Sequence, residues 1–351
     1  MRPLSICALG AALALPAMGK EIAWHTTDLP AVKQKAAAEK KPIAIDFFAT
    51  WCGPCKAMDR TTYLDPEVAK MASKMLMLRL DAESTEGAPI AKDFGVGSYP
   101  TLVFLAADGS EIDRFTGYKT AKEFVPYLSA AIDGKSIFAA NVARLAAHPE
   151  DLDLLAEVAD GYVLRLDDAN ALAHLERLEA ADPDNARGHL ERAYESRADL
   201  YRRKRDFAKA GETLHALLSK VPALDKSDEK QLRTEEGKYF VKAGDADRAV
   251  AAYKVLIEKF PTKESYNAMA WELSQKKLAL DEAEAAAKKA VELSKEDPEI
   301  LDTLAEVYFA QGRLDEAIAL GKKEVGKDPK NDYYARQLKK YEDAKAGKAG
   351  S

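Results

Sequence analysis

The stretch DFFATWCGPCK at residues 46–56 holds two cysteines that are separated by two residues. Its first residues end an apolar run of strand length, residues 42–49, and a helical pattern starts at Pro54. Cys52 therefore lies where a predicted buried strand passes into a helix. Unpaired backbone N–H groups and the positive end of the helix dipole both favour a thiolate at this place. The stretch is thus a candidate dithiol site.

Strand and helix signals alternate on both sides of this stretch, over residues 22–132. The other predicted strands are 75–80, 101–106 and 111–116, the last two joined by a turn at Asp108-Gly109. The predicted helices are 32–40, 88–94, 120–132 and one more that opens at residue 66. Apolar strands in this order predict an α/β fold, with helices flanking one mixed sheet.

The first nineteen residues differ in character from the rest. Arg2 is followed by an apolar stretch at 4–15, and the small residues Ala17 and Gly19 precede Lys20. A charged start, a short apolar middle and small residues at the end are typical of a cleavable secretory signal peptide. We therefore expect a periplasmic or secreted protein, with an uncleaved N-terminal helix or anchor as the alternative.

Removal of this segment would take Cys7 with it and leave Cys52 and Cys55 as the only cysteines. An exported chain with one such pair has no framework of structural disulfides, so the pair must be chemical or metal-binding. Zinc would need two more ligands, and the five histidines are scattered at no ligand spacing. We expect no metal and no cofactor other than a redox-active Cys52–Cys55 disulfide.

A second motif, Tyr99-Pro100-Thr101, stands directly before another predicted apolar strand. Together with the CGPC stretch it makes residues 22–132 resemble the thioredoxin family. Within that family the stretch is most similar to periplasmic thioredoxin-like reductases, such as the C-terminal domain of the membrane reductant transporter of the Dsb system. Lys41-Pro42 ahead of the strand and the run TYLDPEV at 62–68 carry this closer resemblance.

The resemblance implies a role for each residue of the CGPC stretch. Cys52 would be the nucleophile, and Cys55, one helical turn further on, would resolve the mixed disulfide. Pro54 suits the first turn of a helix, where its missing N–H costs nothing. Gly53 would keep the approach to Cys52 open, and Trp51 would flank and shield the dithiol.

Asp46 stands on an otherwise apolar strand, where a buried carboxylate is costly unless it has a task. The resemblance implies that it relays a proton to or from Cys55 through water. The alternative is an aspartate at a strand end that bonds to the backbone. Thioredoxins often place a lysine beside this aspartate; our alignment puts Met77 there and expects Arg79 to face away.

The Tyr99-Pro100 motif is expected to form the substrate-binding edge of the site. The resemblance implies a cis peptide bond before Pro100, which brings the Tyr99 backbone beside the cysteines to pair with an extended substrate. Tyr99 departs from the small aliphatic residue or threonine that is usual there. Gly117 matches a family glycine that lets a loop approach the site closely.

From residue 133 onward strand signals vanish, and residues 133–150 are expected to be a linker or first helix. An alanine followed by proline twelve residues later then recurs, and the sequence LDEA at 280–283 returns at 314–317. This resembles the tetratricopeptide repeat, which pairs two helices, with a small residue where they cross and a closing proline. We expect about five repeats over 150–330, a capping helix at 331–345 and a disordered tail at 346–351, with an irregular helical bundle as the alternative. The recurring alanines are Ala171, Ala210, Ala249 and Ala317, and the unit with Ala283 would close late, at Pro298.

The function expected from these features is disulfide reduction outside the cytoplasm. The net charge of −6 with interspersed signs gives no indication of nucleic-acid binding. Gly-Pro between the cysteines is the dipeptide of reducing thioredoxins, so the expected partners are cysteine-containing exported proteins, an upstream thiol reductant, and a protein on the concave face of the repeats. A redox-linked chaperone or scaffold is the main alternative, and a redox sensor is another. The direction of the reaction, the redox potential, the oligomeric state and the partners' identities do not follow from these residues.

Overall fold

The computed structural model describes residues 21–26, 28–221 and 223–347. It divides the chain into two compact units, Met1–Arg144 and Leu145–Ser351. The expected signal peptide, Pro222 and the last residues of the expected tail lie outside the described residues. None of the helices in the described part is both long and apolar enough to cross a bilayer.

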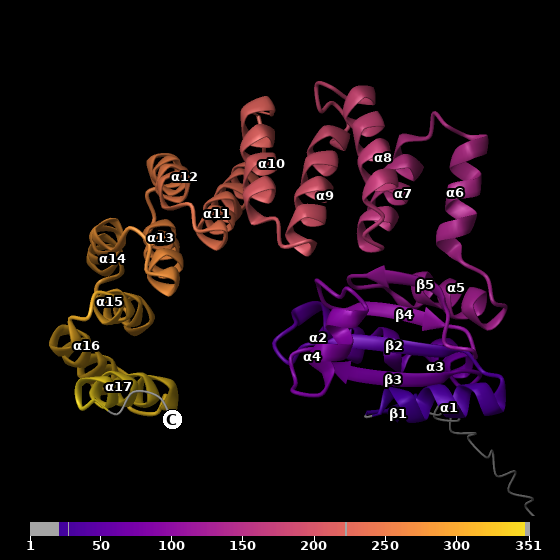
Figure 1. The fold of residues 1–351 in the computed structure, drawn as a ribbon, viewed down its shortest axis with the longest axis horizontal. Helices are drawn as coiled ribbons and strands as arrows, with labels where there is room; N and C mark the ends of the chain where they lie inside the picture. Colours follow the sequence, from indigo (N-terminus) through magenta and orange to yellow (C-terminus); the bar gives the residue numbers. More distant parts are fainter. Residues whose placement is uncertain (1–20, 27, 222, 348–351) are drawn as a thin grey trace, which may run out of the picture. The chain divides into compact units, whose positions relative to one another are not determined.

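The first unit is built on a mixed sheet of five strands in the order β1-β3-β2-β4-β5 (Figure 1). β3 runs parallel to β1 and β2, whereas β4 is antiparallel to both β2 and β5. The predicted α/β class is confirmed, and each predicted strand is present. The strand that the sequence did not reveal, β1, has only two residues, too few to show an alternation. The strands are β1 Trp24–His25, β2 Ile43–Phe48, β3 Leu76–Asp81, β4 Thr101–Leu105 and β5 Glu111–Thr116.

Helices cover both faces of this sheet, because side chains of each strand point alternately to one face and the other. Ile43, Ile45 and Phe47 pack in one core with α1 and α4, while Ala44 packs in the other with α2, α3 and α5. Asp46 follows Ala44 by two residues and so lies on the face of β2 that α2 covers. The helices are α1 Leu29–Glu39, α2 Gly53–Arg60, α3 Pro66–Ala72, α4 Gly87–Asp93 and α5 Ala121–Ile132, with a 3-10 turn η1 at Thr62–Leu64.

The segment at residues 133–150, expected to be a linker or first helix, contains the helix α6 Ile137–Ala147. Its start is fixed to β5 by Asp113, a buried residue whose Oδ2 accepts from the N–H groups of Ile137 at 2.7 Å and Phe138 at 3.2 Å. A carboxylate at a helix N-terminus satisfies N–H groups that have no partner inside the helix. The first unit therefore includes the beginning of α6.

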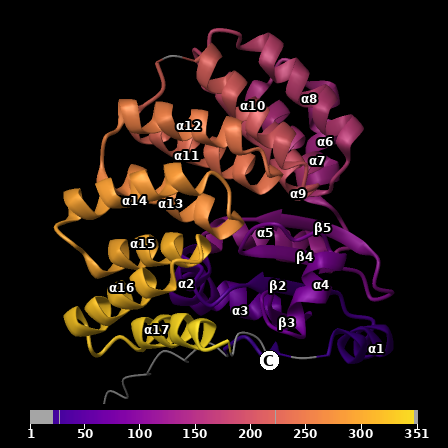
Figure 2. The same cartoon turned by 60° about the vertical axis from the view of Figure 1, so that its left-hand side comes forward.

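The second unit consists of helices in successive pairs, which Figure 2 shows as stacked layers. Each helix packs on the one before it. The first helices of neighbouring pairs also contact one another; for example, α11 contacts α13, and α13 contacts α15. In Figure 1 these first helices lie along the inner edge of the unit and the second helices α10, α12, α14 and α16 along its outer edge. The pairs are α7 Leu152–Leu164 with α8 Asp168–Ala181, α9 His189–Arg203 with α10 Phe207–Lys220, α11 Lys226–Ala243 with α12 Ala246–Lys259, α13 Lys263–Lys276 with α14 Leu280–Ser294, and α15 Pro298–Ala310 with α16 Leu314–Lys327, followed by α17 Asp332–Lys345.

The recurring alanines occupy one equivalent position in these pairs. Each is the fourth residue of a second helix and is completely buried; they are Ala171, Ala210, Ala249, Ala283 and Ala317. Pro183, Pro261 and Pro329 follow two residues after the ends of α8, α12 and α16. Pro298 differs from the expectation: α14 ends at Ser294, and Pro298 is the first residue of α15. Proline is favoured there, since its fixed φ suits a helix start.

The crossing alanines give a test within a single helix. Ala283→Leu inserts side-chain atoms where α14 meets its neighbours and should lower the free energy of unfolding by about 1–3 kcal/mol. Ala285, on the same helix, is exposed, and Ala285→Leu should change it by less than about 0.5 kcal/mol. Urea unfolding followed by far-ultraviolet circular dichroism measures both. Equal effects of the two substitutions would contradict this assignment of the crossing position.

Candidate active site

Cys52 and Cys55 form a disulfide at the N-terminus of α2, with their Cα atoms 5.3 Å apart. Cys52 is the N-cap residue of α2, and its Sγ accepts from the N–H of Cys55 at 3.1 Å. Gly53 and Pro54 form the first turn, where the missing proline N–H is not needed. Each cysteine is only 2% exposed in this oxidised state. The helix start that the sequence predicts is present, and one of its N–H groups, that of Cys55, points at Cys52 Sγ.

Aromatic side chains surround the disulfide. Phe48 and Tyr99 pack against the small cluster of Ala49 and the two cysteines. Trp51 is 65% exposed; its ring meets that of Tyr99 edge-on at 6.0 Å, and its indole N–H donates to Glu83 Oε2 at 2.8 Å. Tyr99 therefore packs against the cluster that contains both cysteines, and Trp51 presents a large ring to solvent beside Tyr99.

The loop ahead of β4 has the predicted backbone. The Tyr99–Pro100 peptide bond is cis. The carbonyl of Pro100 accepts from the N–H of Gly117 at 2.8 Å and from the hydroxyl of Thr116 at 3.1 Å, which ties the end of β5 to this loop. Gly117 has a φ of +85°, and a Cβ added to it would meet nothing within 4 Å. This left-handed backbone favours glycine at position 117.

Asp46 has a cationic neighbour on β3, but it is not at the position that our alignment indicated. Register pairs Asp46 with Arg79 and Ala44 with Met77, and Arg79 Nε lies 3.3 Å from Asp46 Oδ2. The expectation that Arg79 faces away is therefore wrong. Met77 and Arg79 are two residues apart on one strand, so they point to the same face of the sheet.

Arg79 is held from several sides. One terminal nitrogen lies 2.8 Å from Asp59 Oδ1 on α2, and its guanidinium lies over the ring of Phe48 at 4.4 Å from the centroid. Trp24 and Tyr63 are further rings within 6 Å. A planar guanidinium can serve two carboxylates while stacking on an aromatic face, which an ammonium group does less well.

The carboxyl group of Asp46 titrates close to neutral pH. Burial raises its pKa from 3.8 to about 6, and the charge of Arg79 opposes this rise without cancelling it. The side chain is on the face of the sheet that α2 covers. A group with this pKa can both accept and release a proton near pH 7, which is the property that a proton relay needs.

Comparison with known proteins agrees with this geometry in both units. Residues 29–132 match the family model of a thioredoxin-like domain. They form a thioredoxin-like domain. Residues 195–264 and 279–345 match two models of the tetratricopeptide repeat, so the predicted repeats are confirmed in these two segments.

Individual relatives match the thioredoxin-like domain. The thiol:disulfide interchange protein DsbD of Haemophilus ducreyi is 33% identical over 108 residues, which are 29% of this chain and 19% of that protein. DsbD of Yersinia enterocolitica is 34% identical over 109 residues, 30% and 19% of the two chains. The oxidised C-terminal domain of Neisseria meningitidis DsbD has a TM-score of 0.27 and 25% identity, covering 30% of this chain and 96% of that one. The chain thus spans only 19% of the length of the first two relatives.

Over residues 21–26, 28–221 and 223–347, no three histidine, cysteine, aspartate or glutamate side chains are grouped so that they could hold a metal ion.

The raised pKa of Asp46 predicts a pH-dependent effect on stability. Between about pH 4 and 6 the folded protein keeps a proton that the unfolded chain has lost, so stability falls as the pH rises through this window. Asp46→Asn should raise the free energy of unfolding of the oxidised protein by about 1–3 kcal/mol at pH 8 and little at pH 4. Asp133→Asn, at an exposed aspartate, is the control. A gain for Asp46→Asn that is equal at both pH values would contradict the titration described.

Proposed function

We propose that the protein is an exported thiol-disulfide oxidoreductase that reduces disulfides in envelope proteins. The observation that carries this proposal is the Cys52–Cys55 disulfide at the N-terminus of α2 in a thioredoxin-like domain. The similarity to DsbD, a thiol:disulfide interchange protein, supports it. Export is proposed from the signal-like pattern of residues 1–19.

The reaction starts from the reduced dithiol. The Cys52 thiolate attacks one sulfur of the substrate disulfide, which forms a mixed disulfide and releases the other substrate sulfur as a thiolate. Asp46 takes the proton of Cys55, through water, and the Cys55 thiolate attacks Cys52 Sγ. This releases the second substrate thiol and leaves the Cys52–Cys55 disulfide. Two electrons have passed to the substrate, and an upstream thiol reductant returns them.

The substrate would bind across the rim of this site. An extended segment of the substrate would pair with the Tyr99 backbone, and the exposed ring of Trp51, which meets the Tyr99 ring edge-on, offers apolar contact next to it. The loop at Gly117 is tied to Pro100 and would border the same segment. The residues proposed to bind substrate are Trp51, Gly53, Pro54, Tyr99, Pro100 and Gly117.

The repeats are proposed to dock a protein partner on the inner edge formed by their first helices. Tetratricopeptide repeats present extended concave surfaces, and both family-model matches support this role. The same unit supports a second candidate, a redox-linked chaperone in which client binding is the main activity. The observation that favours it is size, since the helical unit Leu145–Ser351 is larger than the unit with the dithiol.

Insulin reduction tests the catalytic proposal. The purified protein should reduce insulin disulfides when supplied with a dithiol, as followed by turbidity. Cys52→Ser should abolish turnover, because no thiolate remains at the helix N-terminus. The exposed Asp133→Asn should leave the rate unchanged. Turnover that persists in Cys52→Ser would overturn the assignment of the nucleophile.

Trapping of mixed disulfides tests which proteins exchange disulfides with Cys52. In Cys55→Ser the mixed disulfide on Cys52 cannot be resolved, so substrates should stay covalently bound and be separable on a non-reducing gel. Cysteine-containing exported proteins and a thiol reductant are the expected captures from the native envelope. The double variant with Cys52→Ser and Cys55→Ser should capture none of them. Clients held equally by this double variant, without a covalent bond, would favour the chaperone.

A further inference from the structure

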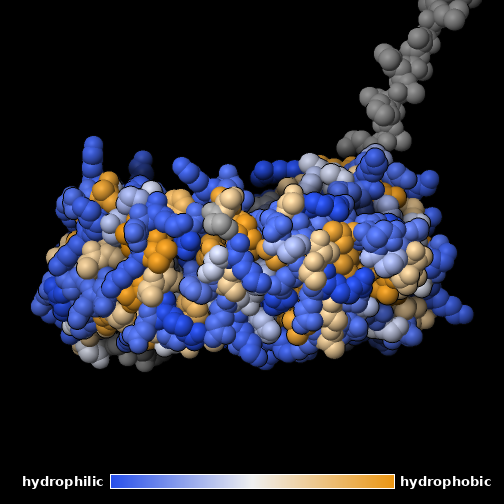
Figure 3. Space-filling model, turned by 90° about the horizontal axis from the view of Figure 1, so that it is seen from above, coloured by the Kyte–Doolittle hydropathy of each residue, from blue (hydrophilic) through white to orange (hydrophobic). Residues whose placement is uncertain are grey.

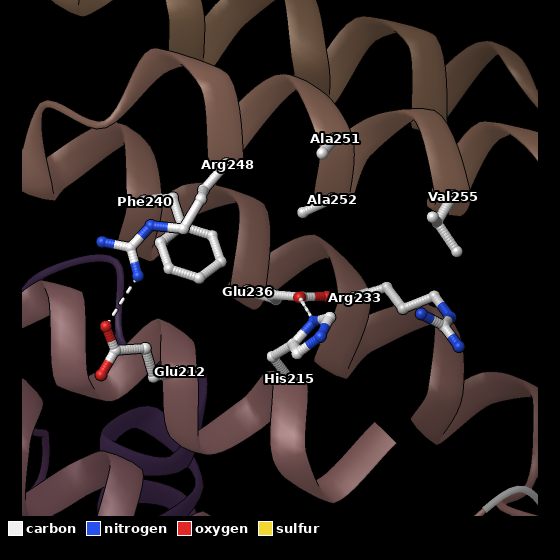
Figure 4. Close-up of a pocket in the computed structure, with 9 residues that line it drawn as sticks. All are labelled: Glu212, His215, Arg233, Glu236, Phe240, Arg248, Ala251, Ala252 and Val255. Atoms are coloured by element: carbon white, nitrogen blue, oxygen red, sulfur yellow. Dashed lines mark hydrogen bonds and ion pairs between the residues drawn. The ribbon is translucent and has the colours of Figure 1, made fainter. Parts of the chain in front are cut away.

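A pocket of about 340 Å³ lies among α10, α11 and α12 (Figure 4). One wall is apolar and comes from small side chains of α12, Ala251 and Ala252, with Val255 one turn further and Phe240 of α11 beside them. Val255 is among the exposed large apolar residues of the chain. The volume is at the lower end of the range for ligand sites, so it suits one or two side chains rather than a large ligand.

A buried carboxylate lies at the centre of this pocket. The Glu236 side chain is only 3% exposed, and its Oε1 is 2.7 Å from His215 Nδ1. Figure 4 shows these two side chains meeting between the apolar wall and α10. The His215 side chain is 70% exposed, so its ring can leave the carboxylate without disturbing the core. Among the residues that the structure places, His215 is the one ion-pair partner found for Glu236.

The two arginines of the pocket already have carboxylate partners. Arg248 lies 2.7 Å from Glu212 and 2.6 Å from Asp245. Arg233 lies 2.8 Å from Glu229. An anionic ligand would have to compete for these pairs and would face Glu236 as well. A cation would meet the Glu236 carboxylate, whose ion-pair partner is the exposed imidazole of His215 and which also feels the charge of Arg233. Because Arg233 is already paired with Glu229, the pocket favours a cation over an anion.

We propose that this pocket binds a lysine side chain of a partner protein, with the ammonium group on Glu236 and the aliphatic stem against Ala251 and Val255. The apolar wall suits four methylene groups, and the carboxylate at its centre suits a compact cation with three donors. The incoming ammonium group replaces the imidazole of His215. On the face of the molecule shown in Figure 3, apolar residues lie in patches among more numerous hydrophilic ones.

Binding at this site can be tested apart from the proposed dithiol chemistry, because its residues come from α10, α11 and α12 and none of them lies in the thioredoxin-like domain. Loss of insulin reduction in Cys52→Ser and loss of lysine binding in a pocket variant are separate results.

The test uses three peptides that differ in one side chain: acetyl-Leu-Lys-Leu-amide, the same peptide with norleucine, and the same peptide with glutamate. Each is titrated into the purified protein while the methyl signals of Val255 are followed by NMR. The lysine peptide should shift these signals and bind about tenfold more tightly than either of the others. Glu236→Gln should remove this preference. Glu235→Gln, next to it on α11 but outside the pocket, should keep it.

A second variant keeps the test valid if Glu236→Gln does not fold. Ala251→Phe changes an exposed residue and fills the pocket, so it should weaken the lysine peptide about tenfold. His215→Ala removes the competing imidazole and should keep the preference for lysine or increase it. Equal binding of the lysine and norleucine peptides, or tightest binding of the glutamate peptide, would overturn the proposal. So would unchanged binding in Ala251→Phe.

Discussion

The ion pair of Asp46 and Arg79 is the interaction on which the candidate site depends. Burying a lone carboxylate among apolar strands is costly, and an opposite charge offsets that cost only when it is close and well oriented. Phe48 under the guanidinium and Asp59 on α2 hold Arg79 so that its Nε lies 3.3 Å from Asp46 Oδ2, an ion pair without a hydrogen bond. The balance leaves Asp46 neither fully ionised nor fully protonated near neutral pH. A weaker partner would leave the carboxyl protonated, and it could then not accept the proton of a thiol.

Arg79 also joins the sheet to the helix that carries the dithiol. Its contacts reach β2 through Asp46 and α2 through Asp59, and Asp59 is one turn after Cys55 on α2. Arg79 thereby links the helix that carries the cysteines to Asp46, the carboxyl group proposed to exchange a proton with Cys55. In the second unit the corresponding constraint is steric. A buried alanine at the fourth position of each second helix lets neighbouring helices approach, and repetition of that contact builds the array.

The sequence was sufficient for those features that local patterns encode. Strand β5, the helix start at the cysteines and the crossing alanines each follow from spacing within a few residues. The pairing of Asp46 with Arg79 could not be predicted from local spacing. It depends on the register of β2 against β3, which is set by packing between segments about thirty residues apart. Recognising that residues 77 and 79 share a face would have kept Arg79 as a candidate. The pocket at Glu236 was missed for a similar reason, since three helices contribute to it and no motif marks it.

Because the substrate becomes covalently bound during disulfide exchange, a docking surface on the repeats does not need high affinity. A mixed disulfide holds the substrate during the reaction, so reversible contacts need only raise the local concentration of the substrate before Cys52 attacks. Contacts of modest affinity are suited to this, because tight binding to the repeats would slow release of the reduced product. A pocket for one lysine side chain, in which an exposed histidine competes for the same carboxylate, has this character. Its binding energy is limited by the need to displace His215, and its selectivity comes from the buried charge of Glu236.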